Sequence, residues 1–277
     1  MRSMSFGLAA GLFIAIGAAS AQDAAPLIPP EIAAAMTAAD VVILGEIHDN
    51  PAHHKVQEAA IALLEPSAVV WEMLTEVGAR RIDAALISQP EEMAKALEWT
   101  DQGWPEFDMY HPIFSAAPAG ARIYGGNVPR AAAMAAIDTG EAVAFGADAA
   151  RFGLTVPLPA AERAEREAAQ MLAHCDAIPQ DSLGAMVRVQ RLRDAVLARA
   201  VIAAMDETGG PVAVITGNGH ARVDWGIPVY LRRVRPDLRV FVLGQSEDGQ
   251  IEGVFDAVID SPPVPREDPC AVFAKPD

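Results

Sequence analysis

The sequence predicts an α/β fold: a mostly parallel sheet covered by helices, with a helical subdomain inserted. Short unbroken apolar runs recur along the chain, and Ala-rich stretches separate them. Strands buried on both faces have this appearance, because helices cover both sides of a parallel sheet. Between residues 130 and 209 almost nothing has the composition of a strand, which indicates that this part is helical.

The first expected element is a short helix over 31–39, and the strands follow it. Strands are predicted at Val41–Leu44, Ala68–Trp71, Arg122–Gly125, Val212–Ile215 and 240–243. Residues 91–114 are expected to form a helix and then an aromatic loop, which holds Trp99, Trp104, Phe107, Tyr110 and Phe114. Helices over 160–173 and 183–207, with a break near 177–180, would make up the subdomain of about 131–209.

Residues 1–21 have the layout of a secretory signal peptide. Arg2 precedes an apolar run over 6–18, and Ala19-Ser20-Ala21 offers a small-residue cleavage site. A membrane anchor is the alternative, but the run falls short of the roughly 20 apolar residues that a span needs. No Cys follows the run, so a lipid anchor is not expected. We therefore expect a periplasmic protein without a stable membrane span, whose mature part, 22–277, is a single α/β domain.

The charge balance excludes some partners. The 277 residues carry 37 acidic and 21 basic side chains, a formal net charge of −16. Loss of residues 1–21 would remove Arg2 and no acid, which gives −17. Nucleic acids need a basic footprint, so we expect no nucleic-acid partner. An anionic small ligand would depend on local cations, for which Arg130, Arg193 and Arg222 are the candidates.

Two cysteines, Cys175 and Cys270, remain in the mature part. In an oxidising compartment they can form a disulfide, but their separation in sequence leaves the pairing open. His174 adjoins Cys175, yet neighbouring residues on a helix point about 100° apart. A metal site made of this pair is therefore not expected.

Polar side chains follow the predicted strands. Two Gly-x-x-His turns, Gly45–His48 and Gly217–His220, close two strands, and Glu72 closes a third. The carboxyl ends of parallel strands form the ligand-binding edge of such a sheet. Taken singly, a strand-end His usually bonds a loop carbonyl. Gathered in one crevice, however, such groups cost desolvation energy unless they serve a ligand, a metal or each other.

Further polar residues adjoin this edge. Asn50 is expected to cap a helix that starts at Pro51, which places His53 and Gln57 one turn apart and His54 beside them. In the long helix, Gln190, Arg193 and Asp194 share a face with apolar residues. They form either a buried network that docks the helix or ligand contacts from a lid.

Taken in order, these motifs resemble the ChaN family. The matching segments are Gly45-Glu46-x-His48, His53-His54-x-x-Gln57, Asn127-x-Pro129-Arg130, Gln190-Arg191-Leu192-Arg193-Asp194 and Gly217-Asn218-Gly219-His220-x-Arg222-x-Asp224-x-Gly226-Ile227-Pro228. The family comprises haem-binding, iron-regulated proteins, often lipoproteins, in a superfamily with the erythromycin esterases and the Tiki metalloproteases. The resemblance implies an α/β core with a helical subdomain, and haem held at a homodimer interface. The missing lipidated Cys departs from the lipoprotein members.

The first functional hypothesis is capture of haem or another iron-containing small ligand for iron uptake. Tyr is a known type of axial haem ligand, and Arg can meet the propionates. Only Tyr110, Tyr124 and Tyr230 are available, and the latter two fall in or near packed elements. Tyr110 is therefore the first candidate for the axial phenolate. The full set expected around haem is Tyr110, His54, Arg130, His220 and Arg222.

The second hypothesis is a metal-dependent hydrolase, an esterase or a peptidase, that uses both Gly-x-x-His motifs. Glu46, His48 and His220 are expected to bind a divalent metal, with His53, His54 or Glu72 as general base and Glu46 in the catalytic set. The spacing does not match a His-Glu-x-x-His helix. A third interpretation is a structural network without a ligand.

Overall fold

The computed structural model describes residues 26–268 and 270–271, so the expected signal peptide lies outside the described residues. A six-stranded sheet forms the centre of the molecule, in the order β3-β2-β4-β1-β5-β6, and all its pairings are parallel. The strands are β1 (Val41–Leu44), β2 (Ala68–Trp71), β3 (Arg122–Gly125), β4 (Val212–Ile215), β5 (Val240–Glu247) and β6 (Ala257–Ser261). The predicted α/β class is confirmed.

The central strands are the apolar runs of the sequence. Every residue of β1, β2 and β4 is buried. Val41 pairs with Val212 on one side and with Val240 on the other, so β1 lies between β4 and β5. The carboxyl ends of β2, β4 and β1 are therefore neighbours, which sets the position of the polar groups that follow them.

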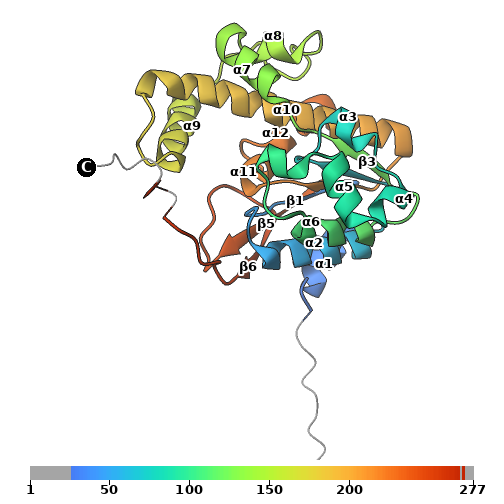
Figure 1. Cartoon of the computed structure of the whole chain (residues 1–277). Helices are drawn as coiled ribbons and strands as arrows, with labels where there is room; N and C mark the ends of the chain where they lie inside the picture. Colours follow the sequence, from blue (N-terminus) through green and yellow to red (C-terminus); the bar gives the residue numbers. More distant parts are fainter. Residues whose placement is uncertain (1–25, 269, 272–277) are drawn as a thin grey trace, which may run out of the picture.

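One face of the sheet is covered by α1 (Pro30–Thr37), α2 (Pro51–Leu64), α5 (Pro90–Ala96) and α6 (Phe107–Ala116) (Figure 1). Trp71 of β2 stacks on Phe114 of α6, with ring centroids 3.7 Å apart. The prediction of an aromatic loop was wrong for these residues, because Phe107, Tyr110 and Phe114 form the buried stripe of a helix. Short elements α3 (Glu76–Ala79), α4 (Ala84–Ile87) and η1 (Trp99–Gln102) complete this part.

The opposite face is covered by the long helix α10 (Leu183–Thr208) and by α12 (Ile227–Val234). In Figure 1, α10 runs between the sheet and the pair α7 (Arg130–Thr139) and α8 (Glu141–Phe145), and α9 (Ala160–Ala173) packs against its first part. The short η2 (Gln180–Ser182) precedes α10, and α11 (Asn218–Ala221) follows β4. No helix in the described ranges is long and apolar enough to cross a membrane.

Two long-range connections fix the chain around the sheet edge. Cys175, in the turn between α9 and α10, forms a disulfide with Cys270 near the C-terminus, which answers the question that the sequence left open. Arg266 contacts both Asp49 and Glu247, and Asn50 donates to Glu247 while its side chain also caps α2 by accepting the Ala52 N–H. The predicted cap is confirmed.

Candidate functional site

The carboxyl edge of the sheet gathers the polar residues that follow β1, β2 and β4. After β1, the Glu46 carboxylate is fully buried, and its Oε1 accepts hydrogen bonds from His48 Nδ1 at 2.6 Å and from the Tyr110 hydroxyl at 2.9 Å. Helix α6 thus places Tyr110 beneath the first Gly-x-x-His turn. The Glu46 carboxylate orients the His48 ring so that Nε2 points away from Glu46.

The second Gly-x-x-His turn is built in the same way. Nδ1 of His220 lies 2.5 Å from Oδ1 of Asp194, a buried residue of α10. Glu72, at the end of β2, accepts hydrogen bonds from the Thr216 hydroxyl and the Gly217 N–H, both at 2.7 Å. Gly217 has to be small here, because a Cβ would lie 3.0 Å from His48 Nε2 and 3.7 Å from Glu72 Oε2.

The two turns converge on one oxygen. Glu72 Oε1 lies 3.4 Å from His220 Nε2 and 3.8 Å from His48 Nε2. Burial alone would raise the pKa of Glu72, but the imidazoles of His220 and His48 and the Gly217 N–H lower it to about 2. For His48, burial is outweighed by the hydrogen bond that Nδ1 donates to Glu46 and by the charge of Glu72, which raise its pKa to about 9. This edge is therefore an alternation of carboxylates and imidazoles.

His53 and His54, in α2, both contact the backbone of the first Gly-x-x-His turn. Nδ1 of His53 accepts the Ile47 N–H at 2.9 Å, and its Nε2 faces the Ser246 carbonyl oxygen at 3.3 Å. His54 Nε2 donates to the His48 carbonyl oxygen at 2.8 Å, and its Nδ1 lies 3.8 Å from Glu46 Oε2. His54 Nδ1 and Glu46 Oε2 are both buried without a hydrogen-bond partner in the described part of the chain. Through these hydrogen bonds, His53 and His54 hold the first Gly-x-x-His turn in place.

A cavity of about 730 Å³ opens beside Glu72 and His220, and we call it the network cavity. It is lined by Glu72, Glu98, Asp101, Gln102, Trp104, Gly126, Asn127, Val128, Arg130, Ala133, Met134, Ile137, Gln170, His174, Met186, Val189, Gln190, Arg193, Leu197 and His220. Arg130 and Arg193 form no ion pair within the described ranges. The Trp104 indole N–H is buried and, within the same ranges, has no hydrogen-bond acceptor.

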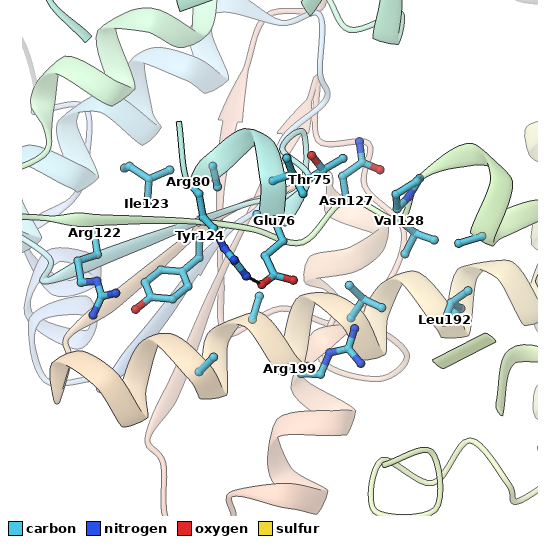
Figure 2. A pocket seen from close by; sticks show the side chains of 18 of the residues that line it. Thr75, Glu76, Arg80, Arg122, Ile123, Tyr124, Asn127, Val128, Leu192 and Arg199 are labelled. Atoms are coloured by element: carbon cyan, nitrogen blue, oxygen red, sulfur yellow. Dashed lines mark hydrogen bonds and ion pairs between the residues drawn. The ribbon is translucent and has the colours of Figure 1, made fainter. Parts of the chain in front are cut away.

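A second cavity, of about 820 Å³, lies between β3 and α10 (Figure 2). Its cations are already engaged, which separates it from the network cavity. Arg80 pairs with Glu76, Arg122 pairs with Glu207, and the Arg199 guanidinium donates to the Phe145 carbonyl while lying over the Phe145 ring. An anionic ligand therefore finds its free cations in the network cavity.

The residues predicted for haem fall into two groups. Arg130 and His220 line the network cavity. Tyr110 is fully buried, and its burial next to Glu46 raises the pKa of the hydroxyl, so the hydroxyl keeps its proton, donates a hydrogen bond to the carboxylate and is not a phenolate. His54 lies beside it. Arg222 forms a two-point ion pair with Asp224 outside the cavity lining.

The residues predicted for a metal are not arranged as a ligand set. Glu46 and His48 bond each other, and no group of three or more His, Cys, Asp or Glu side chains within residues 26–268 and 270–271 has the spacing of a metal site. Instead, Glu72 lies between the two imidazoles. Asp194 and Gln190, from the long helix, both contact His220 Nδ1, so these polar residues form a docking network. Gln190 and Arg193 also line the cavity.

Sequence reasoning missed His174, which lines the network cavity from the end of α9. His174 was considered there only as a neighbour of Cys175. The available signal was its spacing of four from Gln170, because residues i and i+4 share one helix face, and both residues line the cavity.

Comparisons with known proteins agree with this fold. The model of a family described as "Haem-binding uptake, Tiki superfamily, ChaN" matches residues 32–231. ChaN of Campylobacter jejuni, solved in a study of its cofacial haem binding, is similar with a TM-score of 0.63 and 21% identity, over 80% of this chain and 87% of that chain. The type III effector HopBA1 has a TM-score of 0.46 and 16% identity, over 83% of this chain and 91% of that one. No curated protein matches the chain.

Proposed function

Because the chain belongs to the ChaN family of haem-binding uptake proteins in the Tiki superfamily, we propose that it binds haem and that the network cavity holds it. This membership confirms the resemblance indicated by the motifs. ChaN of Campylobacter jejuni binds haem cofacially. The proposal extends haem binding to this chain and assigns it to one cavity.

The composition of the network cavity supports the proposal. Its volume of about 730 Å³ falls within the roughly 300–1,000 Å³ of small-molecule sites. A porphyrin needs apolar walls for its faces, and Met134, Ile137 and Val189, which are exposed or half-buried, supply such surface. Its propionates need cations, which Arg130 and Arg193 supply without losing an existing ion pair. The presence of these two uncommitted arginines beside apolar walls is the observation that carries the proposal.

We further propose that the protein works in the periplasm, in haem or iron uptake. The signal-peptide pattern of residues 1–21 supports export. The disulfide between Cys175 and Cys270 supports an oxidising compartment, because such bonds persist there. Cleavage after Ala21, found by mass spectrometry of the protein from a periplasmic extract, is the expected result. An intact Met1 would contradict it.

Titration of the mature chain with ferric haem tests the binding proposal. We expect a shifted Soret band that saturates at a fixed ratio of haem to protein. Sedimentation of the apo and haem-loaded forms then tests the homodimer that the resemblance to the ChaN family implies, since two haems that face each other would occupy the cavities of two copies of the chain. Absence of a shift, with no quenching of tryptophan fluorescence, would overturn haem binding.

We propose a metal-dependent hydrolase as the second candidate, on one specific observation. Nε2 of His48 and Nε2 of His220 both approach Glu72 Oε1, while Glu46 and Asp194 hold the opposite ring nitrogens. Metal-binding imidazoles are commonly braced by carboxylates in this manner. A divalent ion would polarise a substrate carbonyl and activate water there.

Zinc analysis followed by esterase and peptidase screens tests this candidate. We expect loss of zinc and of activity in both His48→Ala and His220→Ala, with Lys55→Ala, an exposed change in α2, as the matched control. If the wild type retains no metal after dialysis and hydrolyses no ester or peptide in the screens, the hydrolase candidate fails while haem binding is unaffected.

A further inference from the structure

His174 directly follows the last residue of helix α9 and lines the network cavity from that end of the helix. Its Nδ1 lies 2.8 Å from the carbonyl oxygen of Gln170, one turn earlier in the same helix. A carbonyl oxygen only accepts hydrogen bonds, so Nδ1 carries the proton of the neutral ring and Nε2 carries the lone pair. Within residues 26–268 and 270–271, Nε2 has no hydrogen-bond partner.

The other imidazole of the cavity lining and the nearby Tyr110 phenol are committed elsewhere, whereas Met134 and Met186 offer only thioethers. Both ring nitrogens of His220 face carboxylates, Asp194 at 2.5 Å and Glu72 at 3.4 Å. The Tyr110 hydroxyl is fully buried and donates to Glu46. His174 is thus the one imidazole of the described cavity lining with an uncommitted nitrogen.

The backbone around His174 is unusually constrained. Cys175 and Asp176 have φ values of 57° and 56°, the left-handed region that non-glycine residues rarely adopt. Such conformations persist where the surrounding structure imposes them. Here the disulfide from Cys175 to Cys270 anchors the turn directly after His174, so the imidazole is held on a fixed support.

We infer that His174 is an axial ligand of haem in the network cavity. The inference rests on the proposed function, because it requires haem to occupy this cavity. A ligating His commonly donates its other ring N–H to a backbone carbonyl, and His174 already has that arrangement with Gln170. Iron ligation needs the lone pair of Nε2, and the structure leaves that atom available.

The test compares the mature wild type with His174→Ala, with His111→Ala as a matched control. His111 donates to the Ile87 carbonyl from α6 and does not line the cavity, so its loss removes one imidazole elsewhere. Absorbance and electron paramagnetic resonance of the ferric complex, and resonance Raman spectra of the ferrous complex, report whether iron carries a nitrogen ligand. Tyr110→Phe, Met134→Leu and Met186→Leu report on a phenolate or thioether ligand.

We expect imidazole ligation in the wild type and in the His111, Tyr110 and methionine variants. In His174→Ala this signature should disappear and haem affinity should fall at least about tenfold. Added imidazole should restore the wild-type spectrum, which a merely structural defect would not allow. If the wild type binds haem and His174→Ala keeps its spectrum, the inference fails and haem binding stands. If the wild type shows no Soret shift, the proposed function fails and this inference with it.

Discussion

Nδ1 of His220 lies 2.5 Å from Oδ1 of Asp194, although the two residues come from the second Gly-x-x-His turn and from the middle of α10. Both side chains are buried. Two facing carboxylates, Glu72 and Asp194, outweigh the effect of burial and raise the pKa of the His220 imidazole. The contact is therefore a buried ion pair that docks α10 onto the sheet edge.

Asp194→Asn should destabilise the fold by about 3–5 kcal/mol, because it leaves a buried imidazole without one of its charge partners. Urea unfolding of the mature chain, followed by circular dichroism, measures the change. Asp206→Asn is the matched control on the same helix, since Asp206 forms an exposed pair with Arg235. We expect that variant to stay within about 0.5 kcal/mol of the wild type. Equal losses in both variants would show that the buried pair has no special weight.

Gly217→Ala should disturb the convergence of the two turns. Its Cβ would lie 3.0 Å from His48 Nε2, tighter than ordinary packing, so the ring has to move. We expect zinc affinity to fall about tenfold or more, measured by competition with a chelating dye. Gly219→Ala is the control, because the nearest atom to its Cβ would be 4.0 Å away. Unchanged zinc binding in Gly217→Ala would count against a metal at this point.

The core of the fold was predictable because its signal is local. Apolar runs such as Val41–Leu44 are buried on both faces and mark central parallel strands directly. Strand β6 gave no such signal, because its residues alternate between half-buried and exposed. The aromatic stripe of α6 gave no clear helical signal, because Pro112, a residue that usually interrupts helices, lies inside it.

The site was predictable in part for the same reason. Glu46, Glu72 and His220 directly follow strands, so their meeting at one edge follows from the sheet alone. His174 directly follows α9, a helix that packs mainly against α10, so its approach to the cavity depends on tertiary packing. The hydrogen bond from Tyr110 to Glu46 likewise depends on which face of α6 is buried.

Arg130→Gln and Arg193→Gln should each weaken haem binding about tenfold, because each removes a cation that can meet a propionate. The effect should shrink at high salt, since both side chains are exposed. Haem titrations at low and high ionic strength measure it. Arg222→Gln is the comparison, because its guanidinium is already paired with Asp224. A larger loss in Arg222→Gln than in the other two would place the propionates elsewhere.

His53 should make the fold less stable in mild acid. Burial lowers the pKa of its imidazole below the ordinary 6.5, although the Ser246 carbonyl and the Glu247 and Glu46 carboxylates oppose the shift. Between the folded pKa and about pH 6.5 the unfolded chain therefore binds more protons, and the free energy of unfolding falls as the pH falls. His53→Gln cannot titrate, so its unfolding free energy should decline less between pH 7.5 and pH 5.5 in urea titrations. Parallel declines would contradict the assignment.

Removal of the disulfide should affect both stability and haem binding. Cys175 and Cys270 are 95 residues apart, so the bond constrains a long loop in the unfolded chain. The double variant Cys175→Ser, Cys270→Ser should lose about 2–4 kcal/mol in urea unfolding. It should also bind haem more weakly, because the turn that holds His174 is released. Phosphine reduction should reproduce both effects in the wild type and add nothing in the double variant. Unchanged haem affinity in a folded double variant would show that the anchored turn does not position the imidazole.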